Sequence, residues 1–283
     1  MISVVTPCYN AINDGRLEFF IRMMESVHRQ SYRNIEHIVV NNNSDDGTTE
    51  FLREYQRIGW ISTLVDERKQ GIYPAMNTGV RLAKGEYVNI MNTDDYFTDQ
   101  EFFRQSIDAI EENSVDFTHA NRVIKSREGK PNVIKKGDER TAYFRMPFRH
   151  QTMIVKKEVF DEVGLFDETY KIAADYKWIL SMLMAGKKGH YIPRVFVSSL
   201  DGGASSNRQG CIEEVTRVLF ESYGMDNGLS QDDCRRIYLR EPSVILAAKV
   251  LTHVRDPKIR NSVMYGLYLG LKERIRKDKK VKK

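Results

Sequence analysis

Residues 71–95 read GIYPAMNTGVRLAKGEYVNIMNTDD, from Gly71 to Asp95. The spacing of apolar residues predicts a helix over 72–83, followed by a largely apolar strand over 86–91. The strand ends at two adjacent carboxylates, Asp94 and Asp95, although Asp is a poor strand former. Carboxylate oxygens suit a hard divalent cation and, through the cation, a phosphate. The stretch therefore favours an α/β protein that handles a nucleotide diphosphate or a similar ligand.

The sequence on either side continues this alternation of strands and helices. Strands are expected over 2–6, 35–40, 60–65 and 115–120, and helices over 17–27, 47–58 and 100–112. Repeated strand–helix units imply a mostly parallel sheet flanked by helices. Ligands bind such sheets outside the carboxyl ends of the strands. Polar clusters follow three of these ends, at 7–10, 41–46 and 92–95, and their coincidence predicts a site there.

The remainder of the chain changes character. Residues 122–136 are polar and basic and predict a hairpin or an excursion, whereas 146–155 is strand-like around His150 and Gln151. Helices are expected over 156–163 and 173–185, and the pattern beyond about residue 205 is helical. We expect a nucleotide-binding domain over 1–206 and a helical C-terminal extension with a basic tail over 207–283.

Charge is unevenly distributed over the 283 residues. Residues 272–283 carry eight Lys or Arg and two acidic residues, whereas the rest of the chain holds 36 basic and 37 acidic residues. The tail is either a solvated end or a segment attracted to an anionic surface. Nucleic-acid binding is disfavoured because only the tail is basic. The apolar run 263–271 before the tail suits either peripheral membrane attachment or a core helix.

Several features place the protein in the cytosol. The three cysteines are far apart and form no metal or disulfide pattern, which fits a reducing compartment. No apolar run approaches the ~18–20 residues needed to span a bilayer. The first residues enter a strand without a positive segment, so no signal peptide is expected.

Each candidate residue has a functional and a structural interpretation. Asp94 and Asp95 are metal ligands or a polar turn after a strand. The segment 41–48 contacts a base or ribose, or it simply caps a helix. Asp175 is a general base, or a carboxylate that the helix dipole favours in a first turn. Residues 202–206 are a plain loop or a flap over phosphates.

Taken in order, these motifs resemble the inverting glycosyltransferases of family 2, which have the GT-A fold. The resemblance covers about residues 1–206 and rests on the following segments in sequence: Thr6–Asn10, Glu36–Thr48, Gly71–Gly79, Gly85–Tyr87, Asn92–Asp95, His150–Gln151, Gly164–Glu168, Ala174–Tyr176 and Gly202–Ser205. Acidic positions frequent in the family are replaced here by Asn41, Asn92, Ala174, Pro74 and either Lys69 or Gln70. These departures weaken the donor assignment more than the reaction type.

The resemblance implies a role for each candidate. Asp95 is expected to bind Mn²⁺ or Mg²⁺, Asp94 to lie on the ribose or donor sugar, and Asp175 to act as the general base. His150 is expected near the donor or acceptor. The full set of expected nucleotide-sugar contacts is Pro7, Tyr9, Asn10, Asn41, Asn43, Asn77, Asp94, His150 and Gln151.

The expected reaction is transfer of a hexose (EC 2.4) from a nucleotide-diphosphate donor, a UDP-sugar, to a hydroxyl of a lipid-linked glycan. Such a step belongs to bacterial O-antigen, capsule or exopolysaccharide synthesis, in the cytoplasm or at the inner face of the cytoplasmic membrane. A sugar-nucleotide pyrophosphorylase is one alternative, although its Gly-rich signature with Arg and Lys is missing. A non-catalytic nucleotide- or glycan-binding module is another, although it would not need Asp175 at a helix start.

Overall fold

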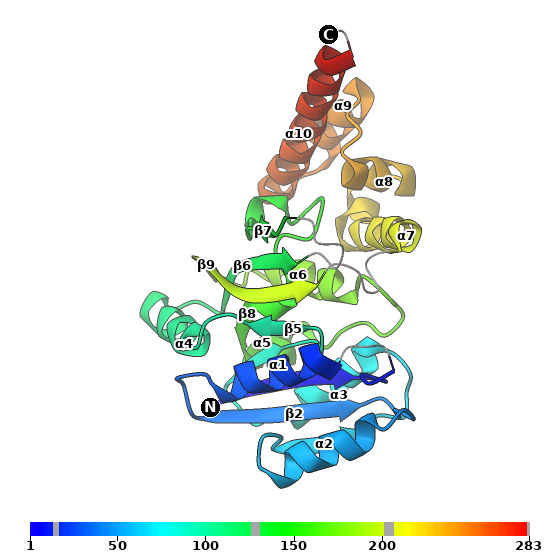
Figure 1. Ribbon diagram of the computed structural model, residues 1–283. Coiled ribbons are helices and arrows are strands. Elements are labelled where there is room, and N and C mark those ends of the chain that lie inside the picture. Colours follow the sequence, from blue (N-terminus) through cyan, green and yellow to red (C-terminus); the bar gives the residue numbers. More distant parts are fainter. Residues whose placement is uncertain (14–16, 126–130, 201–206, 282–283) are drawn as a thin grey trace. The chain divides into compact units, whose positions relative to one another are not determined.

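The computed structural model describes residues 1–13, 17–125, 131–200 and 207–281 (Figure 1). The chain forms two compact units. The first comprises Met1–Gly137, Phe148–Ala174 and Met182–Asp201, and the second comprises Asp138–Pro147, Asp175–Ser181 and Gly202–Lys283. Two short segments that precede residue 206 therefore pack with the C-terminal helices.

The first unit is built on one mixed sheet with the strand order β3-β2-β1-β4-β8-β6-β9-β5, and β7 pairs with β6. The strands β3, β2, β1 and β4 are parallel, as the sequence predicts. Beyond β4 the pairing is antiparallel except between β6 and β9. The bounds are β1 (Ile2–Cys8), β2 (Ile35–Asn41), β3 (Thr63–Asp66), β4 (Tyr87–Ile90), β5 (Asp95–Phe97), β6 (Phe117–Lys125), β7 (Val133–Lys135), β8 (Met153–Lys156) and β9 (Gly189–Leu200).

The sequence patterns did not predict β5 and β9. The strand β9 contains Pro193, which cannot donate to a ladder. A bulge accommodates it, because Ala120 pairs with Ile192 whereas Asn121 pairs with Val195. The expected excursion over 122–136 is confirmed as a hairpin, since β6 and β7 pair in antiparallel register.

Helices cover both faces of the sheet, as alternation along β1 requires. Ile2 and Val4 point into a core shared with α1 and α4. Val5 points to the other face, where α3 packs so closely that a Cβ at Gly79 would clash with it. The helices of this unit are α1 (Leu17–His28), α2 (Thr48–Arg57), α3 (Ile72–Leu82), α4 (Phe102–Asn113), η2 (His150–Thr152) and α5 (Lys157–Val163).

The second unit is helical. Its elements are η1 (Glu139–Thr141), α7 (Arg208–Leu219), η4 (Phe220–Gly224), η5 (Met225–Asn227), α8 (Gln231–Leu239), α9 (Val244–His253) and α10 (Pro257–Val281), and α6 (Ala174–Met184) runs through both units. Gly266 and Gly270 lie inside α10, where side chains would clash with Phe144 and with the Arg240 carbonyl. None of the helices in the described part of the chain is long and apolar enough to cross a bilayer.

Candidate active site

The loops after β1 and β2 lie side by side at one edge of the sheet. Parallel register pairs Cys8 with Asn41, and Asn41 with Asp66 at the end of β3. The carboxyl ends of three strands therefore meet where ligands bind in sheets of this kind. The polar residues at this edge form two groups that differ in their hydrogen bonding.

The first group, here the loop cluster, consists of Asn10, Asn41, Ser44, Asp45 and Asp46. Asn10 Nδ2 donates to Asp45 Oδ1 over 2.9 Å, and the Asp45 amide donates back to Asn10 Oδ1 over 3.1 Å. Ser44 Oγ accepts from the Asn10 amide at 2.9 Å and donates to Asn41 Oδ1 at 2.7 Å. The two loops are thus held together by their own side chains.

Asp46 completes the loop cluster through backbone amides. Its Oδ2 accepts from the amides of Ile12 (2.9 Å) and Asn13 (2.7 Å), and its Oδ1 accepts from the Thr48 amide at 3.1 Å. Burial opposes ionisation, yet the hydrogen bonds from these residues hold the pKa of Asp46 below its ordinary value. The cap on α2 expected from the sequence is only partly present, because the N-cap residue is Gly47 without a side-chain cap and Asp46 accepts from the first residue of the helix.

The other residues expected at the nucleoside pocket occupy different environments. Pro7 is buried in β1, and Asn41 Nδ2 donates to Asp66 Oδ1 and Thr49 Oγ1. Tyr9 is 55% exposed, and Asn43 is exposed with a positive φ of 51°. Tyr9 and Asn43 therefore present their side chains to solvent, whereas Pro7 and Asn41 shape the loops beneath them.

Asn77 lies inside the first unit, on α3. Its Nδ2 donates to the Phe166 carbonyl at 2.8 Å and to Glu168 Oε1 at 3.0 Å, and its Oδ1 accepts from the Phe166 amide at 2.9 Å. The side chain is 1% exposed. In this structure Asn77 fixes the loop at 166–168, and its expected contact with a nucleotide stays a prediction.

The second group, here the carboxylate cluster, consists of Asn92, Asp94, Asp95 and Gln151. Asp95 is 4% exposed at the start of β5, opposite Ser199 on β9. Gln151 Nε2 donates to Asp95 Oδ2 over 2.7 Å, and Asn92 Nδ2 approaches the same oxygen at 3.4 Å. The cluster joins two motifs that are far apart in the sequence.

The protonation of Asp95 reflects its surroundings. Burial and the neighbouring charge of Asp94 raise its pKa to about 6, outweighing the nearby Ser199 hydroxyl and the charges of Arg122 and His150, which lower it. Ionisation of Asp95 therefore costs more free energy in the fold than in the unfolded chain. A bound cation would compensate this charge.

Two buried oxygens strengthen the case for a ligand here. Within the described ranges, Asn92 Oδ1 and Gln151 Oε1 have no hydrogen-bond partner. Other buried oxygens of the described residues also lack partners, among them Asn42 Oδ1 and Asn89 Oδ1, so these two matter because both belong to side chains that contact Asp95. Across those same ranges, no three His, Cys, Asp or Glu side chains gather as a metal site. Mg²⁺ and Mn²⁺ use only one or two protein carboxylates beside water and phosphate, so Asp95 with these oxygens fits such a cation.

The structure corrects the strand expected over 146–155. His150 and Gln151 lie in the short 3₁₀ helix η2, and the strand β8 starts only at Met153. Asn89 holds this turn in place, because its Nδ2 donates to the carbonyls of Gln151 (3.2 Å) and Met153 (2.7 Å). Asn89 was not singled out from the sequence, although a polar residue inside the buried strand β4 was the available signal.

Asp175 belongs to the second unit and is considered within that unit. It lies in the first turn of α6, is 5% exposed and accepts the Tyr176 amide on Oδ1 at 2.9 Å. Tyr176 is buried and its hydroxyl donates to the Ala142 carbonyl at 2.6 Å, which fixes the start of this helix. The expected flap over 202–206 lies outside the described residues.

Comparison with known proteins gives consistent findings. Residues 3–166 match the model of the family described as Glycosyl transferase family 2. The uncharacterized glycosyltransferase EpsJ of Bacillus subtilis (strain 168) is 26% identical over 227 residues, covering 71% of this chain and 62% of EpsJ. TuaG of the same strain, a putative teichuronic acid biosynthesis glycosyltransferase, is 29% identical over 132 residues, covering 46% of this chain and 50% of TuaG. The chain thus spans less than two thirds of these relatives.

Solved structures show the same fold. TarS 1–349 of S. aureus, solved in complex with UDP-GlcNAc, superposes with a TM-score of 0.64 at 17% identity, covering 84% of this chain and 71% of that one. The mannosyltransferase PcManGT of Pyrobaculum calidifontis, solved with GDP-Man and Mn²⁺, gives a TM-score of 0.59 at 16% identity, covering 95% and 86%. The predicted GT-A-like α/β fold with C-terminal helices is confirmed.

Proposed function

The chain belongs to glycosyl transferase family 2, and on this premise we propose that it transfers a hexose from a nucleotide-diphosphate sugar to a hydroxyl of a glycan acceptor, with inversion. The observation that carries the proposal is the carboxylate cluster. A buried carboxylate with a raised pKa lies there beside two buried oxygens that have no partner among the described residues. Perturbed titratable groups gather at functional sites because chemistry requires them.

The donor is proposed to be a UDP-sugar. A structural neighbour was solved with UDP-GlcNAc and another with GDP-Man and Mn²⁺, which supports a sugar carried on a nucleoside diphosphate. The relative TuaG carries a name from teichuronic acid biosynthesis, which supports a role in bacterial polysaccharide synthesis. The acceptor is proposed to be a lipid-linked glycan at the cytoplasmic face of the membrane.

The proposed mechanism assigns a separate role to each residue of the candidate site. A divalent cation held by Asp95 would supply charge stabilisation to the departing diphosphate. Gln151 orients Asp95 through the 2.7 Å hydrogen bond, and Asp94 is proposed to lie on the ribose or donor sugar. Asp175 accepts the proton of the acceptor hydroxyl as general base. The hydroxyl oxygen bonds to the anomeric carbon as the bond to the diphosphate breaks on the opposite face, so configuration inverts.

The remaining pocket residues divide into two proposed roles. Tyr9 and Asn43 are exposed and are proposed to contact the nucleoside directly. Pro7, Asn10 and Asn41 support the loops that carry them. His150, whose charge acts on Asp95, is proposed to lie near the donor or acceptor.

A panel of nucleotide sugars tests the reaction class. We expect release of the nucleoside diphosphate from one donor, faster with an acceptor glycan, and a product whose anomeric configuration by NMR is opposite to that of the donor. Release of pyrophosphate from a nucleoside triphosphate and a sugar phosphate would instead indicate a pyrophosphorylase. Donor binding without turnover would indicate a binding module.

Replacement of Asp175 tests the assignment of the base. Loss of a general base costs about 10²–10⁴-fold in rate, so Asp175→Asn should lower kcat by that factor and leave donor binding nearly unchanged. Asp232 is a matched control, because it also lies in the first turn of a helix, α8, but is exposed. If kcat of Asp175→Asn stayed within a few-fold of that of Asp232→Asn, another group would be the base.

A further inference from the structure

The helix α9 exposes an apolar face. Val244 and Ile245 at its start are exposed to 87% and 83%, and Leu251 is exposed to 55%. Helical spacing places these residues on one side together with Ala248 and Thr252, which are also exposed. This side of α9 therefore carries no charged residue.

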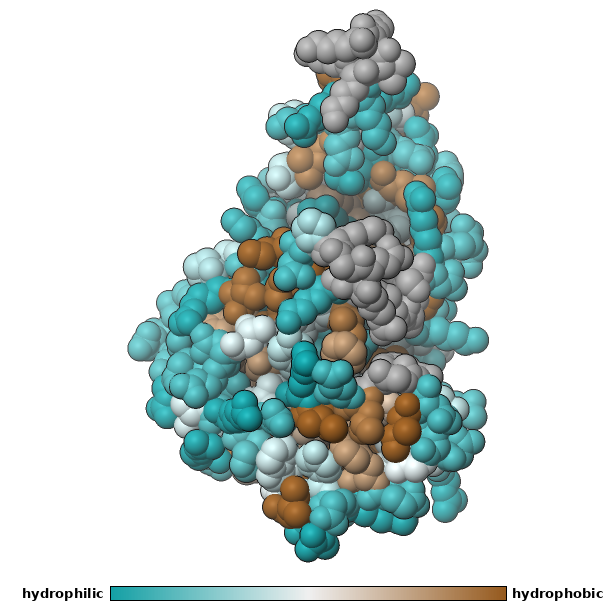
Figure 2. Space-filling model, viewed as in Figure 1, coloured by the Kyte–Doolittle hydropathy of each residue, from teal (hydrophilic) through white to brown (hydrophobic). Residues whose placement is uncertain are grey.

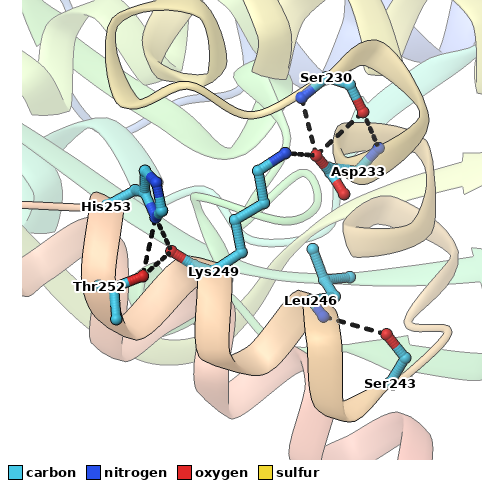
Figure 3. Close-up of polar contacts among 7 residues, drawn as sticks. All are labelled: Ser230, Asp233, Ser243, Leu246, Lys249, Thr252 and His253. Atoms are coloured by element: carbon cyan, nitrogen blue, oxygen red, sulfur yellow. Dashed lines mark hydrogen bonds and ion pairs between the residues drawn. The ribbon is translucent and has the colours of Figure 1, made fainter.

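The opposite side of α9 is anchored to its neighbours in the second unit (Figure 3). Leu246 and Val250 are buried, with exposed fractions of 1% and 0%. Lys249 Nζ forms an ion pair with Asp233 Oδ2 on α8 at 2.5 Å, and Ser243 Oγ caps the helix by accepting the Leu246 amide at 3.1 Å. The orientation of α9 is thus fixed by its own contacts, and these contacts turn Val244 and Ile245 away from the core.

The helix α10 adds a second apolar stripe. Val263 and Leu267 are buried on the side where Gly266 and Gly270 approach Phe144 and Arg240. The apolar run 263–271 is therefore a core helix on that side. On an adjoining side Tyr268, Leu271 and Ile275 are exposed to 57%, 46% and 48% at helical spacing. Figure 2 shows apolar side chains at the surface of the C-terminal helices, among hydrophilic ones.

The same region of the chain carries an excess of positive charge. Residues 240–283 contain 13 Lys or Arg and four Asp or Glu, whereas the other residues contain 31 and 35. Lys272, Arg274, Arg276 and Lys277 are exposed on α10 beside the stripe. Exposed apolar residues on α9 and α10, together with the exposed basic residues of α10, match the two components of an anionic bilayer, a hydrocarbon interior and negative headgroups.

We propose that the outer faces of α9 and α10 bind an anionic lipid bilayer, with Val244, Ile245 and Leu251 inserting among the acyl chains and the basic residues of α10 on the headgroups. The proposal adds an apolar contact on α9 to the electrostatic contact of the basic tail, which the sequence analysis considered. The proposal does not depend on the transfer reaction, because it rests on the second unit alone.

Co-sedimentation of the full chain with lipid vesicles tests the proposal. We expect binding to vesicles of phosphatidylcholine with a quarter phosphatidylglycerol, at least tenfold weaker binding to phosphatidylcholine alone, and weakening by salt. The double variant Val244→Glu, Ile245→Glu should lower the partition coefficient at least tenfold, because it removes two inserted apolar side chains and adds two negative charges. The matched control is Ile58→Glu, since Ile58 is 48% exposed next to α2 in the first unit, and it should bind as the wild type does.

Other outcomes would overturn the proposal. Equal binding by the double variant and the wild type would remove α9 from the contact, and no binding of the wild type would exclude the surface altogether. Light scattering of the same samples identifies the main alternative, in which a wild-type dimer dissociates in the double variant and the face joins two copies. Circular dichroism confirms folding, and donor turnover by the double variant separates a failure of this proposal from a failure of the proposed reaction.

Discussion

The loop cluster and the carboxylate cluster both follow strand ends of the same unit, yet they differ in how their polar atoms are satisfied. In the loop cluster, Asn10, Asp45 and Asp46 bond to one another and to backbone amides. In the carboxylate cluster, Asp95 is buried with a raised pKa, and Asn92 and Gln151 keep buried oxygens without partners in the described part of the chain.

From this difference we infer that the loop cluster stabilises the fold and that the carboxylate cluster is the candidate ligand site. Asp46 has its pKa lowered by hydrogen bonds, so its ionised form stabilises the fold. Asp95 has its pKa raised by burial and by Asp94, so its ionised form destabilises the fold until something compensates it. Two aspartates that look alike in sequence therefore act in opposite directions.

The largest expected effect concerns turnover. Asp95→Asn keeps the shape of the side chain but removes the charge that would hold the cation, which is worth several kcal/mol in such reactions. We expect kcat to fall by about 10³-fold. Asp99→Asn is the control, because Asp99 follows β5, where it is ion-paired with Arg194. Near-equal rates of the two variants would remove the carboxylate cluster from the reaction.

The next effect concerns the residue that orients Asp95. Gln151→Ala removes the 2.7 Å hydrogen bond to Asp95, and loss of such supporting contacts typically weakens metal affinity 10–100-fold. We expect this loss in Mn²⁺ titrations, with the affinity restored in part by Gln151→Asn. Gln100→Ala serves as control, since Gln100 is exposed. Unchanged Mn²⁺ affinity in Gln151→Ala would make the residue merely structural.

The stability of Asp95→Asn should change in the opposite direction from its activity. The pKa of Asp95 is about 6 in the fold, whereas its ordinary value is 3.8. The protonated side chain therefore stabilises the fold at low pH, and this contribution to the free energy of unfolding is lost as pH rises through 6. Without metal at pH 7.5, Asp95→Asn should raise the free energy of unfolding by about 1–3 kcal/mol. The gain should vanish below about pH 4, and urea titrations at both values of pH measure it. A loss of stability at pH 7.5 would contradict the raised pKa.

The smallest effect belongs to the loop cluster. Asp46→Asn should lower the free energy of unfolding by about 1 kcal/mol, because a charged acceptor of three backbone amides becomes a neutral one. The sign is opposite to that of Asp95→Asn in the same urea titration. Glu50→Gln, an exposed residue in the first turn of α2, is the control. If Asp46→Asn were more stable than the wild type, the contrast between the clusters would fail.

Local patterns predicted the parallel half of the sheet well, because its strands are buried and its helices are amphipathic. They missed β5, which has only three residues, and β9, whose Pro193 reads as a strand breaker until a bulge accommodates it. These errors arise where pairing between distant segments overrides local propensity.

Only the part of the candidate site that lies within one short segment could be predicted from the sequence. Asp94 and Asp95 were apparent because paired carboxylates do not belong at the end of an apolar strand. The contact between Gln151 and Asp95 was not apparent, because 56 residues separate them and η2 interrupts the expected strand. Asn77 was expected to contact the nucleotide sugar, but its side-chain amide bonds to the loop at 166–168. Only the folded chain shows this contact, because the two segments are far apart in the sequence.

The most direct test of the central claim is Mn²⁺ binding in the presence of UDP, followed by electron paramagnetic resonance. The wild type should bind Mn²⁺ saturably, Asp95→Asn should not, and Asp46→Asn should bind as the wild type does once its folding is confirmed. Wild-type affinity in Asp95→Asn, or an equal loss in both variants, would contradict the assignment of the ligand site to the carboxylate cluster.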